Sequence, residues 1–245
     1  MYKNRHVCAV IPARDEALSI GKVVSELNAT GLVDRIIVCD NGSRDATAAI
    51  ACSCGAELVT ETRPGYGAAC SRALAAIRQT DIVVFVDADD SLQLDEIPSL
   101  LEPIVAGVDL AIGVRAPAWR ARGSMTAAQV FGNWIASQLI FLFWRQRVSD
   151  LGPFRALRFD ILQQLQMRDR RCGWTVEMQV RAIQLKLNCR EVPVHYRARI
   201  GKSKISGSLK GVVIAGIDII GTILRLALNS GRNPLPDKLV STPKL

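Results

Sequence analysis

The sequence predicts an α/β fold, a mostly parallel sheet flanked by helices. Short β-branched apolar runs alternate with segments of helical spacing through residues 1–115. The runs are apolar throughout, as is typical of strands buried on both faces, and a polar motif follows each of the first four. Because ligands of such sheets bind beyond the carboxyl ends of the strands, these motifs mark the expected site.

The expected elements follow directly from this alternation. Five strands are predicted, at residues 7–11, 35–40, 56–60, 81–87 and 108–113. Four helices are predicted between them, at residues 19–29, 45–53, 67–79 and 95–107. A helix over 174–187 and a strand-like run over 189–196 follow in the second half.

Two strongly apolar helices are expected in the second half, at residues 126–144 and 209–230. The first is too short and too polar to span a membrane, and the second carries Asp218 near its middle. Beside many Lys and Arg residues, such helices favour contact with a membrane surface. The alternatives are core helices of a soluble domain or an interface between two copies of the chain.

The net charge of +8 hides an asymmetry. Residues 1–110 carry 9 Lys and Arg against 16 Asp and Glu, a charge of −7, whereas residues 111–245 carry 22 against 7, a charge of +15. The acidic half suits a cation, and the basic half suits phosphates or an anionic membrane. Nucleic acid is not expected as a partner, because no nucleic-acid-binding motif occurs and an acidic pocket does not serve that purpose.

The chain is expected to form one large domain over residues 1–208, with halves 1–115 and 116–208, then the apolar helix 209–230 and a tail at 231–245. The amino terminus lacks the apolar core of a signal peptide. The seven cysteines show no paired spacing and indicate buried thiols in a reducing cytoplasm. The expected location is therefore cytoplasmic, at the inner face of the membrane.

The motif DADDS (87–91) gives the sharpest chemical signal. Three crowded carboxylates are costly unless a cation or solvent compensates them. Asp87 and Asp89 suit a hard divalent ion that also takes phosphate oxygens and water. The alternative is a solvated helix start, in which Asp90 or Ser91 serves as a cap.

Two further motifs follow other strands. DNGSRD (40–45) places Asp40 at a strand end, where its carboxylate can accept hydrogen bonds from a base or ribose. TRPGYG (62–67) offers Arg63 as a phosphate-binding charge, with Gly65 and Gly67 allowing close backbone approach. The sequence has no GxGxxG fingerprint after a strand, no P-loop and no nucleophile–His pair, and both histidines are expected to be structural.

Together, IPARDE, DNGSRDAT, RPGYGAA and VDADDS resemble the family 2 inverting glycosyltransferases with a GT-A fold. The later stretch DLGPFRALR, GWTVEMQVRA and EVPVHYRARIGKSKISG resembles the branch with dolichyl- and polyprenyl-phosphate hexose synthases. The resemblance covers residues 7–208. It implies that residues 1–115 hold a nucleotide-sugar and that 116–208 hold an acceptor.

The resemblance also implies residue roles. Pro12, Arg14, Glu16 and Asp40 would line the nucleotide pocket, while Asp87 and Asp89 would flank the sugar diphosphate and hold Mg²⁺ or Mn²⁺. Polyprenyl-phosphate hexose synthases can carry a metal-binding Gln two positions after the second Asp, where this chain has Ser91. Asp90, Ser91 and water are therefore the candidates for the third metal ligand. The residues expected to hold the acceptor phosphate are Arg115, Arg122, Arg199, Lys202 and Ser203.

The function implied is transfer of a hexose from a UDP- or GDP-sugar to a polyprenyl or dolichyl phosphate, with inversion and with the metal stabilising the departing diphosphate. A phosphate monoester attacks without a strong base. A soluble or glycan hydroxyl acceptor is the alternative and requires a carboxylate base, for which Glu177 and Asp150 are the candidates. A catalytically inactive nucleotide-sugar-binding protein is the remote alternative. Some relatives carry extra membrane helices, whereas one apolar helix ends this chain, so peripheral membrane association is expected. Two copies of the chain are also expected to be able to pair through the apolar helices.

Overall fold

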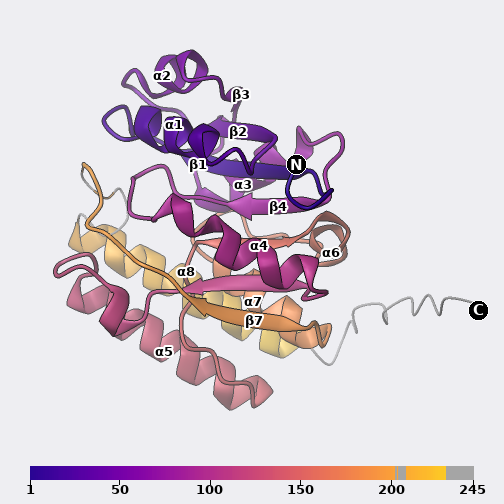
Figure 1. Ribbon diagram of the computed structural model, residues 1–245. Helices are drawn as coiled ribbons and strands as arrows, with labels where there is room; N and C mark the ends of the chain where they lie inside the picture. Colours follow the sequence, from indigo (N-terminus) through magenta and orange to yellow (C-terminus); the bar gives the residue numbers. More distant parts are fainter. Residues whose placement is uncertain (202, 204–207, 230–245) are drawn as a thin grey trace, which may run out of the picture.

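The computed structural model, which describes residues 1–201, 203 and 208–229, contains a mixed sheet of seven strands (Figure 1). The strand order is β3-β2-β1-β4-β6-β5-β7, and β6 alone runs antiparallel to its neighbours. This confirms the predicted class, a mostly parallel sheet. The strands are β1 (Val7–Ala13), β2 (Arg35–Asp40), β3 (Glu57–Thr60), β4 (Ile82–Phe85), β5 (Leu110–Val114), β6 (Arg155–Arg158) and β7 (Cys189–Pro193).

Helices cover both faces of the sheet, and each predicted helix is present with ends shifted by up to four residues. Short 3₁₀ turns lie at Leu94–Glu96 and Pro117–Trp119. The helices are α1 (Ile20–Thr30), α2 (Thr47–Ser53), α3 (Tyr66–Ala75), α4 (Ile97–Val105), α5 (Ala127–Trp144), α6 (Phe159–Gln164), α7 (Trp174–Gln184) and α8 (Leu209–Asn229). The predicted tail at 231–245 lies outside the described residues.

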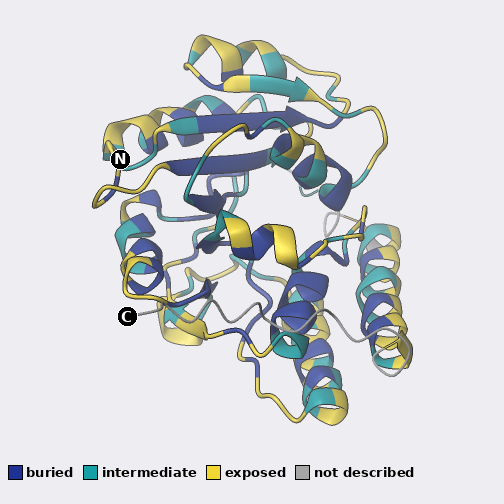
Figure 2. Ribbon diagram, turned by 90° about the vertical axis from the view of Figure 1, so that its right-hand side faces the viewer, coloured by how far each residue is buried: buried dark blue, intermediate teal, exposed yellow. Residues whose placement is uncertain are grey.

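Two hydrophobic cores form because successive side chains of a strand point to opposite faces. In β1, Val7, Ala9 and Ile11 pack in one core with α1 and α4, whereas Cys8 and Val10 pack in the other with α3, α6 and α7. The central strands β1 and β4 are dark blue in Figure 2, which marks them as buried, whereas the edge strand β3 is exposed or intermediate. Burial on both faces explains why the central strands are apolar.

The helices α5, α7 and α8 form a third cluster beside the sheet. Val176 and Val180 of α7 pack against Ala136 and Ile140 of α5, and Ile223 and Leu226 of α8 join them. The structure thus places the two predicted apolar helices side by side, and α7 connects them to the sheet.

The strand β6 was not predicted, and it shapes the edge where ligands are expected. It lies between β4 and β5, with Arg155 opposite both Phe85 and Ile112. Because β6 is antiparallel, the segment that precedes it lies at the carboxyl ends of β4 and β5. This brings Asp150 next to Arg115, which follows β5.

The cysteines correct one expectation. Cys8, Cys39 and Cys70 are buried thiols as predicted, but Cys52 and Cys189 are exposed, and Cys54 and Cys172 are half-buried. The prediction of buried thiols is therefore wrong for four of the seven. All seven are free.

A close backbone contact joins the start of α3 to the loop between α6 and α7. The amide of Gly67 donates to the carbonyl of Arg171 at 3.1 Å, and the amide of Ala68 donates to that of Arg170 at 2.9 Å. A Cβ at Gly65 would lie 2.1 Å from the carbonyl oxygen of Arg170. Gly65 and Gly67, which were expected to allow close backbone approach, allow this loop to approach α3.

We expect Gly67→Ala to lower the free energy of unfolding by about 2 kcal/mol, since its Cβ would lie 2.4 Å from the carbonyl oxygen of Asp169. The matched control is Gly132→Ala within α5, where a Cβ meets nothing within 4 Å. There the better helix propensity of alanine should raise stability by up to ~1 kcal/mol. Urea unfolding of both variants checks the pair, and equal effects would contradict the contact.

Candidate active site

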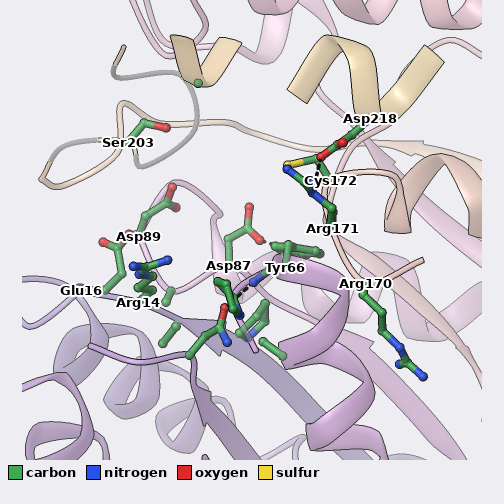
Figure 3. Close-up of a pocket in the computed structure, with 18 of the residues that line it drawn as sticks. Arg14, Glu16, Tyr66, Asp87, Asp89, Arg170, Arg171, Cys172, Ser203 and Asp218 are labelled. Carbon is green, nitrogen blue, oxygen red and sulfur yellow. Dashed lines mark hydrogen bonds and ion pairs between the residues drawn. The ribbon is translucent and has the colours of Figure 1, made fainter. Parts of the chain in front are cut away.

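A cavity of about 830 Å³ opens at the carboxyl ends of β1, β2 and β4 (Figure 3). The loop between α6 and α7 and one side of α8 form its other wall. The predicted site residues that line it are Pro12, Arg14, Glu16, Arg63, Asp87, Asp89, Arg199 and Ser203.

Other predicted site residues are not among those that line the cavity. Arg122 lies exposed in the segment before α5. Lys202 lies outside the described residues. Asp40, Arg115, Asp150 and Glu177 are buried or half-buried next to other partners.

Asp87 lies on the floor of the cavity beside Tyr66. The Tyr66 hydroxyl donates to Asp87 Oδ1 at 3.2 Å. Burial, together with the negative charge of Asp89, raises the pKa of Asp87 to about 7. A cation that binds together with a ligand would therefore stabilise the ionised form of this carboxylate.

Asp89 is held on both of its oxygens. The Ser91 hydroxyl donates to Oδ1 at 2.5 Å, while Oδ2 faces Arg199 at 3.2 Å. Arg199 also donates to Glu16 at 2.6 Å, so one guanidinium bridges two carboxylates of the cavity. The amide of Ile200 donates to the carbonyl of Asp89 at 2.9 Å, which fixes this segment across the end of β4.

Asp90 turns away from the cavity. It adopts a positive φ of 60°, and Lys22 of α1 donates to Oδ2 at 2.6 Å. The three aspartates of the motif thus have different partners: a hydroxyl for Asp87, Arg199 for Asp89 and Lys22 for Asp90. Of the three, Asp87 and Asp89 line the cavity.

Asp40 and Asn41 lie where β2 ends. The Asn41 side chain donates to the carbonyls of Glu61 and Arg63 and accepts from the amide of Gly65 at 2.8 Å, which joins the ends of β2 and β3. Asp40 Oδ1 is buried and accepts no hydrogen bond from the described residues. An unsatisfied buried acceptor is costly, so this oxygen favours a ligand with an N–H or O–H group.

Arg115 and Asp150 form a buried pair behind the cavity. Asp150 accepts from the Arg115 amide at 2.9 Å and from its guanidinium at 2.8 and 2.7 Å. Burial alone would raise the pKa of Asp150, but the hydrogen bonds and charge of Arg115 hold it below its usual value. Arg115 and Asp150 therefore meet each other's need for a hydrogen-bond partner and an opposite charge.

Glu177 is fully buried near the start of α7. Its carboxylate accepts from the amides of Arg168 and Asp169 at 2.9 and 2.6 Å and from Arg181 at 2.9 Å. These contacts shape the loop between α6 and α7 that forms the cavity wall.

The cavity also contains residues that the sequence did not single out for a site. Tyr66 belongs to the quoted GYG motif, and Asp218 was noted as a polar residue in an apolar helix. The loop 170–172 does not directly follow a strand, and apart from its positive charge nothing in its sequence indicated a binding site. These additional lining residues are Asn41, Tyr66, Arg170, Arg171, Cys172 and Asp218.

We expect Asp150→Asn to lower the free energy of unfolding by about 3 kcal/mol at neutral pH, because it leaves the Arg115 guanidinium buried without its counter-charge. The depressed pKa means that the folded protein binds this proton more weakly than the unfolded chain. The contribution is therefore full above the unfolded value of 3.8 and disappears as the pH falls below it.

Denaturant titrations of the wild type at pH 7 and pH 2, and of Asp150→Asn at pH 7, measure this contribution. Asp160→Asn is the control, since Asp160 pairs with Arg158 at the exposed surface and should change stability by no more than about 0.5 kcal/mol. A stable Asp150→Asn protein would contradict the structural role of the pair.

Comparison with known proteins identifies the family. The model of glycosyl transferase family 2 matches residues 8–166. The chain is 36% identical over 220 residues to an uncharacterized glycosyltransferase of Mycobacterium tuberculosis, covering 86% of this chain and 95% of the relative. It is 27% identical over 214 residues to the dolichyl-phosphate hexose transferase of Haloferax volcanii, covering 87% and 92%.

Among solved structures, the fold is similar to glucosyl-3-phosphoglycerate synthase of Mycobacterium tuberculosis, with a TM-score of 0.74 and 23% identity over 96% of this chain and 82% of that chain. That structure contains Mn²⁺, UDP and the reaction product. The seven-stranded sheet is thus that of the GT-A fold, as the sequence predicted. The chain is a glycosyltransferase and belongs to glycosyl transferase family 2.

Proposed function

We propose that this enzyme transfers a hexose from a nucleotide-sugar to a polyprenyl or dolichyl phosphate at a membrane surface, with inversion. One observation carries the proposal: a single cavity extends from Asp87 and Asp89 to α8, whose outer face is apolar and exposed. A charged donor and a lipid acceptor can meet in such a cavity. The dolichyl-phosphate hexose transferase that resembles this chain along most of its length supports this acceptor class.

The nucleotide-sugar would occupy the strand-end part of the cavity. Pro12, Arg14 and Arg63 would surround the nucleotide, and Asp40 at the end of β2 would lie behind them. The diphosphate would lie beside Asp87 and Asp89. The solved neighbour with bound UDP supports a UDP-sugar, with a GDP-sugar as the alternative.

The cavity fits a divalent metal such as Mg²⁺ or Mn²⁺. Asp87 and Asp89 offer hard oxygen ligands, and Asp89 already faces a cation, Arg199. Within the described residues, no cluster of three or more His, Cys, Asp or Glu side chains forms a complete metal cage. This suits an ion that takes few carboxylates and completes its shell with diphosphate oxygens and water. Such an ion would neutralise the leaving diphosphate.

The positions of the two carboxylates predicted as bases favour a phosphate acceptor. Neither candidate base, Asp150 or Glu177, lines the cavity, and both are held in buried hydrogen bonds. No histidine is among the described residues that line it. A phosphate monoester carries its own negative charge and attacks without a base, whereas a hydroxyl group must lose a proton.

The surface of α5 and α8 supports a peripheral membrane location on the cytoplasmic side. Lys210–Asn229 is, among the described residues, the one helix long and apolar enough to span a membrane, with a mean hydropathy of 2.0 and 22% of the segment buried. Asp218 and Arg225 within it favour a position at the interface rather than across the bilayer. The exposed apolar side chains of the two helices are Val130, Phe131, Trp134, Leu142, Phe143, Val213, Ile214, Ile217, Leu224 and Leu228.

A soluble acceptor is the second candidate. It is favoured by the fold of glucosyl-3-phosphoglycerate synthase, whose product is named in its solved structure. In that case the apolar faces of α5 and α8 would be buried between two copies of the chain. The third candidate is a protein that binds nucleotide-sugars without turnover. Turnover of a nucleotide-sugar by the wild type would distinguish an active enzyme from it.

We expect wild-type protein to gain thermal stability from one member of a panel of UDP- and GDP-sugars when Mn²⁺ is present, by about 2.7 kcal/mol at a hundred times the Kd. Asp89→Ala should lose the Mn²⁺-dependent part of this gain and at least ~100-fold in sugar transfer or hydrolysis. Asp95→Ala, which removes an exposed carboxylate outside the cavity, is the matched control. Wild-type behaviour of Asp89→Ala would refute the metal site, and binding without turnover in the wild type would indicate an inactive binding protein.

We also expect the protein to float with anionic liposomes at low salt. Trp134→Ser and Ile217→Ser, which change side chains 57% and 66% exposed, should each weaken binding about tenfold by removing apolar area from the interface. Leu18→Ser is the control, because Leu18 is exposed on another part of the molecule. No flotation of the wild type, together with a dimer in sedimentation that these substitutions dissociate, would favour the soluble alternative.

A further inference from the structure

We propose that Arg171 binds the phosphate of the acceptor and that Asp218 of α8 is its partner while no acceptor is bound. The inference rests on the proposed function, since it names the group that receives a phosphate-bearing acceptor. The class of ligand is a phosphate monoester, carried by a lipid or by a small soluble molecule.

The backbone of Arg171 is fixed from two sides. Its amide donates to Asp169 Oδ1 at 2.7 Å, and its carbonyl accepts from Gly67 at the start of α3. Asp169 is held in turn by the Thr222 hydroxyl of α8 at 3.0 Å. Glu177 accepts from the amide of Asp169, so the loop is preorganised before any ligand arrives.

The side chain of Arg171, by contrast, has a partner that a phosphate can replace. Its Nε lies 3.1 Å from Asp218 Oδ2, with the two side chains 63% and 16% exposed. That oxygen accepts no well-aligned hydrogen bond from the part of the chain that the structure describes. A half-exposed ion pair contributes little, whereas a phosphate dianion offers a guanidinium two parallel charge-assisted hydrogen bonds.

Asp218 is part of the cavity wall rather than of the outer face of α8. Gly211, Ile214 and Asp218 all line the cavity, and their spacing of three and four residues puts them on one side of the helix. Arg171 and Asp218 point toward each other at this wall in Figure 3. An acceptor phosphate at Arg171 would therefore leave its organic part beside Ile214, close to the exposed apolar face of the same helix.

The other arginines at or near the cavity are engaged elsewhere. Arg199 bridges Glu16 and Asp89, and Arg115 is buried against Asp150. Arg170 donates to Ser71 of α3 and points away from Asp218 (Figure 3). Arg14 and Arg63 lie at the strand-end part of the cavity, where the nucleotide is proposed. Among the described residues, Arg171 is thus the cation best placed for an anion at the α8 wall.

Steady-state kinetics with the nucleotide-sugar selected by thermal shift test this role. The two acceptors are geranylgeranyl phosphate in detergent micelles and 3-phosphoglycerate, which separate a lipid from a soluble source. Arg171→Gln should raise the KM for the acceptor that is used by 10- to 100-fold with little change in kcat, the loss of one charge-assisted contact. Arg171→Lys should restore part of this loss. Asp218→Asn should lower the KM several-fold, because the competing carboxylate is gone.

Arg168→Gln is the matched control, since it removes the same charge from an exposed position in the same loop that does not line the cavity. Its KM should equal that of the wild type. The Mn²⁺-dependent thermal shift with the nucleotide-sugar should be unchanged in every variant, which excludes a loss of folding or of donor binding. A purely structural role of the ion pair would instead make Arg171→Gln and Asp218→Asn change KM in the same direction.

Two results would overturn the inference, and they are distinguishable. If the wild type transfers sugar to geranylgeranyl phosphate and Arg171→Gln keeps its KM, Arg171 does not bind the acceptor, and the proposed function stands. If the wild type binds the nucleotide-sugar but uses neither phosphate acceptor, the proposed function falls and the inference falls with it.

Discussion

The cavity exists because the backbone at Gly65 and Gly67 lies directly against the backbone of residues 169–171. No side chain fits between the two segments, since a Cβ at either glycine would overlap a carbonyl oxygen. The contact ties the strand-end motifs to the loop before α7. Through Asp169 and Thr222 it reaches α8 as well. One backbone contact therefore sets the distance between the two walls of the site.

Charge compensation is the second constraint on this site. Carboxylates that converge at the edge of a sheet repel one another, and the repulsion grows as water is excluded. The structure gives Asp89 and Glu16 a shared guanidinium from Arg199, and gives Asp90 the ammonium of Lys22. Among the described residues, Asp87 accepts a hydrogen bond from the Tyr66 hydroxyl, and burial and the charge of Asp89 raise its pKa to about 7. A divalent metal would therefore stabilise the ionised strand-end carboxylates while it binds the diphosphate oxygens.

The strand-end half of the site was predictable because its signals are local. Each motif follows an apolar run, and parallel strands bring their carboxyl ends to one edge, so Pro12, Glu16, Asp87 and Asp89 could be grouped from the sequence. Asp40 was also placed correctly at the end of its strand, although it lies behind the lining residues.

The other wall was not predictable, because it depends on pairings between distant segments. The antiparallel insertion of β6 places Asp150 beside Arg115, and the two satisfy each other instead of facing the cavity. The loop 170–172 reaches the site only through its contact with α3, which no spacing in the sequence reveals. Asp218 stands out in the sequence as a charged residue within an apolar helix. Whether its side chain faces the cavity, however, depends on how α8 packs on α5 and α7.

The positions of the carboxylates bear on the chemistry itself. A general base must reach the proton that it removes and must be ready to take it up. Asp150 is turned to Arg115, and Glu177 holds two backbone amides and Arg181. Among the described residues, Asp218 is the carboxylate that lines the α8 wall, and it is paired with Arg171. Removing a proton there would require that pair to open, whereas an anionic acceptor would take over the arginine and need no base. This arrangement of the carboxylates therefore supports the proposed phosphate acceptor over a hydroxyl acceptor.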